Sequence, residues 1–212
     1  MKYVASIREY EQDSFFSPIK TTYDYALRVL AVLEKLLSSR NEHKRPQNAY
    51  ILLDEEKCAR RVFVVSKTKI ESFVFNYNIV LNEGCTLSVA LEESWLSYEI
   101  LSCAKMIINQ FMCDDRKWIN EEDNDLLNEY RRNILDTSQK LIRHIFYSEP
   151  SYLRYDYDPK HDKEEAHPKH HLDINLSVQG AYKIGINSNA HSTQLDWLMD
   201  VLSQKTDCHI LT

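Results

Sequence analysis

The chain has 212 residues, of which 43% are hydrophobic and 27% are charged, and its formal net charge is −6. This composition is typical of a soluble globular protein. The negative charge argues against sequence-independent nucleic-acid binding, which depends on neutralising phosphates, but it is compatible with a local basic site. The five cysteines contain no C-x-x-C pair, so they favour a reducing compartment over a disulfide framework.

Several common classes of protein are excluded by what the sequence lacks. Gly84, Gly180 and Gly185 are its three glycines, and their spacing fits neither a phosphate-binding loop nor a dinucleotide fingerprint. There is no signal-peptide pattern and no apolar run of about twenty residues, the length that a membrane helix needs. We therefore expect a cytoplasmic protein without a membrane partner.

The N-terminal part of the chain predicts one helix followed by a β-rich block. Residues 1–20 are a loosely patterned lead-in with a short helix before the break at Pro18. Thr21 with Asp24 is typical of a cap for a helix that ends near Arg40. Short strands are predicted at 49–53 and 61–66. Residues 70–81 alternate between apolar and polar, and with 85–91 they predict a hairpin with one buried face.

Further helices are predicted at 94–111 and 120–148. The first of these segments is apolar nearly all round, so a buried strand followed by a short helix is an alternative. The second has an N-terminal cap residue, acidic residues at its start and basic residues at its end, and it stops before Pro150.

The last third of the chain predicts strands at 152–158, 170–177 and 181–186 and a helix at 192–203. We expect one α+β domain over residues 1–212, with a mainly antiparallel sheet flanked by helices. Its N-terminal helical and β part would cover residues 1–118. The long helix, a polar β-hairpin and the closing helix would cover 119–212.

The chemically richest segment lies in the predicted polar hairpin. Four of the eight histidines fall within eleven residues, near one arginine and three aspartates. These residues are His161, His167, His170, His171, Arg154, Asp156, Asp158 and Asp173. Such side chains bind divalent metals, transfer protons near neutral pH or hold phosphate.

Strand alternation predicts how these residues are arranged. On the first strand Arg154, Asp156 and Asp158 share one face. On the second strand His171, Asp173 and Asn175 share one face. If the strands pair in an antiparallel hairpin, these polar groups converge on one surface, with His161 and His167 at its rim. Aspartate is a poor strand former, so three aspartates here favour a functional site.

Three chemistries fit this surface. In the first, Asp156, Asp158 and Asp173 hold Mg²⁺ or Mn²⁺ and Arg154 binds the phosphate of a phosphodiester. In the second, His167 and His171 cleave RNA as acid and base without metal, with Arg154 or Lys169 stabilising the phosphate and Asn175 helping to bind substrate. A third, a zinc site from His161, His167 and His170 or His171, has a spacing that matches no standard zinc module.

A purely structural interpretation also accounts for these residues. Arg154 would then pair with Asp156 or Asp173, and the histidines would cap turns in a charged loop. Charge-paired strands are common, and clustered titratable groups mark functional sites only statistically.

The segment Leu153-Arg154-Tyr155-Asp156-Tyr157-Asp158, followed by His167-Pro168-x-x-His171-Leu172, resembles an uncharacterised bacterial family, domain of unknown function 2290. In that family an R-Y-x-Y-D strand precedes an H-P-x-x-H-L strand. The resemblance covers mainly residues 150–203 and implies that Arg154, Asp156, Asp158, His167 and His171 form one motif. Asp173 departs from the family pattern, which favours the metal-free chemistry.

The working hypothesis is a bacterial nuclease-like protein that cleaves RNA or DNA at this hairpin, as an effector in a phage-defence or toxin–antitoxin system. The alternative is a non-catalytic subunit that recognises a protein partner in an operon-encoded defence complex. The thirteen tyrosines and the apolar segment 95–111 are typical of such an interface.

Overall fold

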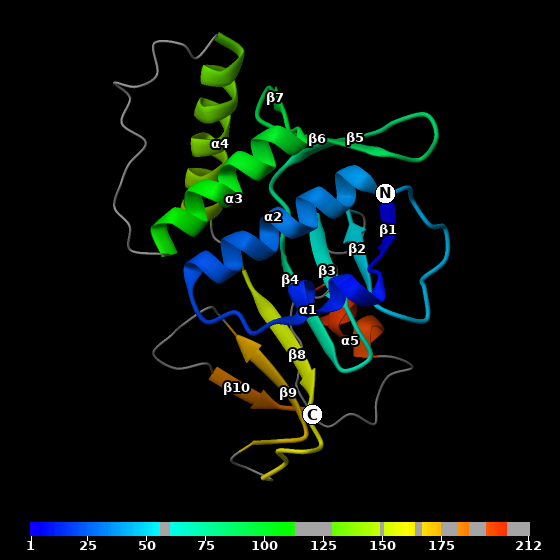
Figure 1. The fold of residues 1–212 in the computed structure, drawn as a ribbon. Helices are drawn as coiled ribbons and strands as arrows, with labels where there is room; N and C mark the ends of the chain where they lie inside the picture. Colours follow the sequence, from blue (N-terminus) through cyan, green and yellow to red (C-terminus); the bar gives the residue numbers. More distant parts are fainter. Residues whose placement is uncertain are drawn as a thin grey trace. The chain divides into compact units, whose positions relative to one another are not determined.

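The computed structural model describes residues 1–55, 60–112, 129–148, 151–163, 167–174, 182–186 and 194–202. Within them, helices and mainly antiparallel sheet confirm the predicted α+β class (Figure 1). Contacts within the chain group the residues into two compact units. The first unit comprises residues 1–20, 40–76 and 149–212, and the second comprises 21–39 and 77–148.

The first unit is built on a seven-stranded sheet in which every neighbouring pair is antiparallel. The strands, in sheet order, are β1 (Lys2–Ser6), β2 (Tyr50–Asp54), β3 (Arg61–Val65), β4 (Lys69–Val74), β8 (Leu153–Tyr157), β9 (His170–Ile174) and β10 (Tyr182–Gly185). Three short helices belong to the same unit: η1 (Glu9–Glu11), α1 (Gln12–Phe16) and α5 (Gln194–Val201). The predicted segments 175–177 and 192–193 lie outside the described residues.

Strand β1 was not predicted, because residues 1–20 were expected to be a lead-in with a short helix before Pro18, and of these α1 agrees with the expected helix. The central residues of β1, Tyr3, Val4 and Ala5, are buried. They pair with residues of β2 that lie almost fifty positions further along the chain. A local pattern of five residues carries no information about that partner.

One face of the seven-stranded sheet is apolar and packs against α5. Alternate residues of the strands, among them Leu52, Phe63, Tyr155 and Leu172, form a single buried cluster with Leu198 of the helix. Burial of this apolar area fixes which side of β8 and β9 faces inward, because a shift by one residue would reverse every side chain.

The opposite face changes character across the sheet. It is apolar over β1 to β3, where Ala5, Ile51 and Val64 occupy neighbouring register positions. It becomes polar at β4, where Glu71 pairs with Val64 on one side and with Arg154 of β8 on the other. The polar residues of the predicted hairpin therefore continue a face that is apolar elsewhere.

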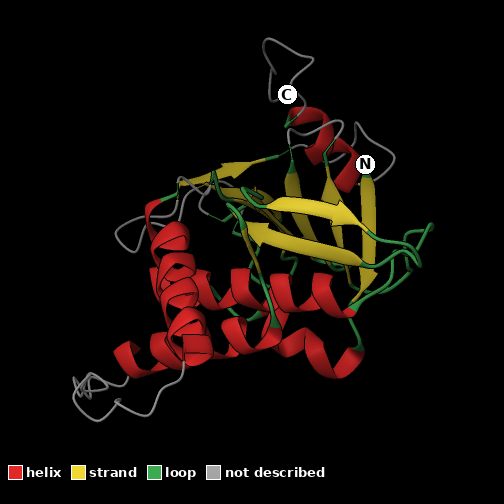
Figure 2. Cartoon of the chain, turned by 90° about the horizontal axis from the view of Figure 1, so that it is seen from above, coloured by secondary structure: helices red, strands yellow, loops and turns green. Residues whose placement is uncertain are grey.

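The second unit combines three helices with a small sheet. The helices are α2 (Thr22–Ser38), α3 (Tyr98–Met112) and α4 (Glu129–Tyr147), and they pack together (Figure 2). The sheet consists of β5 (Asn78–Leu81), β6 (Leu87–Leu91) and β7 (Ser94–Trp95). Residues 120–128 of the predicted long helix lie outside the described residues.

The start of α2 is as predicted. The Thr21 hydroxyl accepts a hydrogen bond from the backbone of Asp24 at 3.1 Å, and the Asp24 carboxylate accepts one from the Thr21 backbone at 2.8 Å. This reciprocal capping satisfies donors that the first turn of a helix leaves without partners.

Two other segments differ from the predictions. The predicted strand 70–81 is divided into β4 and β5, which belong to different sheets, and Leu81 is exposed although it was expected on the buried face. The predicted helix 94–111 begins with the short strand β7 and becomes helical at Tyr98. Among the described helices, none is long and apolar enough to cross a membrane.

Candidate functional site

Strands β8 and β9 form the predicted antiparallel pair, and their register brings the polar residues together. Arg154 lies opposite Asp173, and Asp156 lies opposite His171. All four residues project from the face of the sheet opposite α5, because Tyr155 and Leu172 occupy the apolar face. The convergence that strand alternation predicted for these four residues is confirmed.

The face is much less exposed than the sequence suggested. His171 is 1% exposed and Asp173 is 4% exposed. The side chains of Arg154 and Asp156 are 18% and 14% exposed. They are therefore the part of these four residues that solvent reaches most easily. A buried charge is costly unless it is paired, and the pairing of these groups therefore determines whether the site is stable.

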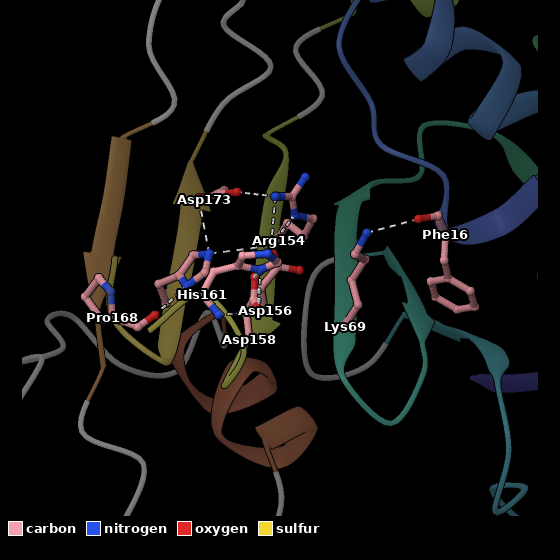
Figure 3. A network of polar contacts seen from close by, with 9 residues as sticks. Phe16, Lys69, Arg154, Asp156, Asp158, His161, Pro168 and Asp173 are labelled. Carbon is pink, nitrogen blue, oxygen red and sulfur yellow. Dashed lines mark hydrogen bonds and ion pairs between the residues drawn. The ribbon is translucent and has the colours of Figure 1, made fainter. Parts of the chain in front are cut away.

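Arg154 bridges the two aspartates (Figure 3). Its Nε donates to Oδ2 of Asp156 at 2.8 Å, and its Nη2 forms a short contact with Oδ2 of Asp173. Burial lowers the pKa of the Arg154 guanidinium, but the charge of Asp156, aided by Asp173, outweighs burial and raises it. The guanidinium is therefore permanently charged, as the purely structural interpretation of the hairpin requires.

His171 is oriented by the backbone of the loop before it. Its Nδ1 lies 2.8 Å from the carbonyl oxygen of Pro168. Since a carbonyl oxygen can only accept a hydrogen bond, Nδ1 carries the proton. The other ring nitrogen, Nε2, lies 3.6 Å from Oδ2 of Asp156 and 3.9 Å from Oδ1 of Asp173.

The side chains of Asp156, His171 and Asp173 form a compact group of metal-ligand atoms. Each residue offers one such atom, and the three atoms lie within 4.8 Å of one another. Two ligands bound to one ion at about 2.1 Å are separated by at most about 4.2 Å, so the group is within a small adjustment of closing on a cation.

Asp158, which was predicted as the third aspartate ligand, is engaged elsewhere. Its Oδ2 lies 2.9 Å from Nδ1 of His161, and its Oδ1 also accepts from the His161 backbone. This hydrogen-bonding lowers the pKa of the Asp158 carboxyl. Asp158 follows the end of β8 and begins a turn, so strand alternation no longer directs its side chain. His171 takes its place in the group of ligand atoms.

The remaining predicted residues are distributed around this group. The His167 ring packs edge-on against His171, with centroids 4.7 Å apart. The Lys169 ammonium lies 5.2 Å from the centroid of the Tyr157 ring, where a cation interacts favourably with an aromatic face. Asn175 lies outside the described residues.

His170 faces away from the candidate site. Its Nδ1 lies 2.6 Å from the Tyr155 hydroxyl, and its ring stacks on Tyr157 with centroids 4.8 Å apart. Burial, aided by the charge of Lys169, lowers the pKa of His170. Burial also raises the pKa of Tyr155 to about 12, so the tyrosine keeps its proton. These contacts place His170 away from the other histidines, so the zinc site considered from the sequence would need His171, which packs against His167, in its place.

Strand β4 contributes two residues that the sequence reasoning missed. In the register, Glu71 lies opposite Arg154 and Lys69 lies opposite Asp156. Glu71 is fully buried, and the Lys69 ammonium donates to the backbone oxygen of Phe16 at 3.0 Å (Figure 3). A glutamate inside the apolar segment Ile70-Glu71-Ser72-Phe73 was a visible indication of a polar partner.

Comparison with known proteins gives no family assignment. No family model, no curated protein and no solved structure matches this chain. The geometry of the Asp156–His171–Asp173 group and its arginine therefore provides the basis for a functional proposal.

Proposed function

We propose that the protein is a divalent-metal-dependent phosphodiesterase that cleaves nucleic acid at the β8–β9 face. The observation that carries the proposal is the group of ligand atoms from Asp156, His171 and Asp173 within 4.8 Å of one another. Arg154 lies directly beside them and supplies a group that recognises phosphate.

The orientation of His171 suits a metal ligand. Histidines that bind metals usually donate their second ring N–H to a backbone carbonyl or carboxylate, which fixes the tautomer. The contact between Nδ1 and the Pro168 oxygen has this arrangement and leaves Nε2 between two carboxylates. A divalent cation bound at Nε2 would also be attracted by both of these carboxylates.

The ligand set favours Mn²⁺ over Mg²⁺. Mg²⁺ is bound mostly by oxygen and keeps several waters, while an imidazole nitrogen together with carboxylates suits a transition metal. The three-aspartate set considered from the sequence favoured Mg²⁺ and Mn²⁺ alike. In the structure the third member of the group is His171 and not Asp158, and this shifts the preference toward Mn²⁺.

Arg154 has two functions in this proposal. Without metal it compensates the charges of Asp156 and Asp173. A divalent cation would take over that compensation, and the planar guanidinium would then be available to form paired hydrogen bonds with a phosphate. Since Arg154 and Asp156 are the more exposed members of the group, substrate would approach from their side.

Metal-free RNA cleavage by two histidines fits the geometry less well. That chemistry places an acid and a base on opposite sides of one phosphate. The rings of His167 and His171 are in direct contact, at 4.7 Å between centroids, so no phosphate fits between them. In the metal-dependent mechanism a bound ion would activate water and polarise the phosphate. His167, beside the ligand group but not part of it, would accept a proton.

Cleavage of labelled single-stranded and duplex RNA and DNA tests the proposal. We expect wild type to cleave with Mn²⁺ and to lose cleavage with EDTA, and His171→Ala and Asp173→Asn to lose at least 100-fold in rate, as about 2.7 kcal/mol of lost stabilisation implies. His161→Ala is the matched control, because His161 is exposed and binds Asp158. Cleavage unaffected by EDTA, or equal in wild type and His171→Ala, would contradict the proposal.

The cellular role proposed with this activity is that of an effector in a phage-defence or toxin–antitoxin system. Induced expression in a bacterial host should slow growth for wild type but not for Asp173→Asn. Equal growth of both strains at equal protein level would contradict the toxin role. It would not bear on the enzymatic proposal, which the cleavage assay tests.

A second candidate function is partner recognition without catalysis. Among the described residues, every exposed large hydrophobic side chain except Tyr10 belongs to the second unit. Trp95, Tyr98 and Met106 are of the types enriched in protein interfaces. This function would be favoured if wild type cleaved no substrate under any metal condition and co-eluted with a neighbouring gene product.

A further inference from the structure

The second unit contains a pocket lined by all three of its helices. Its volume is about 550 Å³. This lies within the range of about 300–1,000 Å³ that is usual for small-molecule sites. Most of its walls are apolar or aromatic, formed by Tyr23, Ile107, Phe111, Ile142, Phe146 and Tyr147.

Polar side chains line the pocket at Thr22 of α2 and on α4, which carries the charged residue of the lining. Gln139 and Arg143 both come from α4 and are four residues apart, so they lie on the same face of that helix, one turn apart. Ile107 and Phe111 have the same spacing on α3 and present an apolar wall. The pocket therefore has an apolar side and a side with one guanidinium.

The charge of α4 adds to this asymmetry. Its described exposed side chains include Arg131, Arg132, Lys140 and Arg143 but a single acidic residue, Asp136. The chain as a whole has a net charge of −6, whereas these exposed side chains of α4 comprise four basic groups and one acidic group. Within the described residues the Arg143 side chain shows no ion pair, whereas Lys105 of α3 is paired with Glu34.

The aromatic residues of the pocket are unusually open to solvent for their size. Tyr23 is 37% exposed, Phe111 is 44% exposed and Tyr147 is 87% exposed. Tyr23 packs edge-on against Phe146, with ring centroids 5.7 Å apart, so these two rings are held in place by each other. A ligand with an apolar body would shield this surface from water.

We propose that this pocket binds an amphiphilic carboxylate, an elongated apolar molecule with one anionic end. The apolar body lies against the aromatic and aliphatic walls, and the carboxylate pairs with Arg143 and accepts from the Gln139 amide. The site is separate in sequence and in chemistry from the β8–β9 face, so the proposal does not depend on the phosphodiesterase activity.

Calorimetric titration of the full chain with octanoate, decanoate and dodecanoate, each below its micelle concentration, tests the proposal. We expect one molecule bound per chain, with affinity rising about fourfold for each added methylene as its apolar surface is buried. Decyltrimethylammonium has the same chain length with a positive end, and it should bind at least tenfold more weakly than decanoate.

Variants of α4 locate the anionic end. Arg143→Gln should lower the affinity for decanoate at least tenfold and reduce the preference for decanoate over decyltrimethylammonium. Arg132→Gln is the matched control, since it removes one exposed arginine of the same helix that does not line the pocket. Phe111→Ala, at an exposed position, should weaken both ligands equally.

Three outcomes would overturn the proposal. They are the lack of saturable decanoate binding, equal affinity for the anionic and cationic ligands, and equal effects of Arg143→Gln and Arg132→Gln. Analytical ultracentrifugation adds a fourth, because a dimer that dissociates in Phe111→Ala would show that a second copy covers the pocket instead.

Discussion

Arg154 of β8 lies directly opposite Asp173 of β9 and forms an ion pair with it across the two strands. The same guanidinium pairs with Asp156 on its own strand, so one cation compensates two carboxylates, one of them buried. The stability of this face therefore depends on a single side chain.

Replacement of Arg154 by alanine should lower the free energy of unfolding by about 3–5 kcal/mol, because it leaves the buried carboxylate of Asp173 and the partly buried carboxylate of Asp156 without their cation. Urea denaturation monitored by circular dichroism measures this loss. Addition of Mn²⁺ should restore more stability to Arg154→Ala than to wild type, since the ion takes over the missing charge. Equal effects of Mn²⁺ on both proteins would show that no ion enters the group.

Mn²⁺ should raise the melting temperature of wild type. At a concentration of about one hundred times its dissociation constant, a ligand that binds only the folded state stabilises it by about 2.7 kcal/mol. For a chain of this length that corresponds to an increase of about 5–10 °C. Asp173→Asn should lose this increase, whereas Asp158→Asn should keep it, because Asp158 binds His161. If Mn²⁺ raised the melting temperature of Asp173→Asn as much as that of wild type, the ion would bind elsewhere.

The loop that orients His171 depends on the small size of Gly185, which lies opposite His171 in the β9–β10 register. A Cβ atom at position 185 would lie 2.9 Å from Cγ of Pro168, whose carbonyl oxygen holds His171. Gly185→Ala should therefore destabilise the protein by about 1–3 kcal/mol and weaken Mn²⁺ binding.

The double variant Gly185→Ala with Pro168→Ala provides the control for this prediction. It removes the proline ring atom that clashes and keeps the backbone carbonyl. We expect it to recover most of the loss, because two residues in contact do not act additively. If the double variant lost as much stability as the two single variants together, the close approach of position 185 to Pro168 would not be the cause.

His170 should make stability depend on pH. Its pKa in the folded protein is lowered below the ordinary value of 6.5, mainly by burial. The unfolded chain therefore binds more protons as the pH falls through about 6.5, so stability decreases there and levels off only below the folded pKa. Melting curves between about pH 7.5 and pH 5 should show this decrease, and His170→Gln should show less of it. A pH dependence unchanged in His170→Gln would contradict the assignment.

The sequence was informative where the structure is local and periodic. Alternation along β8 and β9 predicted that Arg154, Asp156, His171 and Asp173 share a face, because a two-residue period needs no knowledge of the rest of the chain. The cap at Thr21 was equally local, since its partner is three residues away. These features follow from backbone geometry alone.

Long-range pairing could not be predicted in this way. The approach of Glu71 to Arg154 joins residues of strands β4 and β8, whose order in the sheet no local pattern specifies. The burial of His171 was not predicted either, so a face expected to be solvated is largely enclosed. The displacement of Asp158 from the ligand group follows from the turn after β8, where alternation ends.

The pairing of β8 with β9 also bears on how reliably the chain folds. A slip of β8 by one residue would turn Arg154 and Asp156 toward α5 and bring Tyr155 among the polar groups of β9, so both faces would oppose the error. Natural sequences favour one alignment when every alternative is penalised. The four polar residues Arg154, Asp156, His171 and Asp173 therefore also fix the register of the two strands. They would keep this role in a variant without catalytic activity.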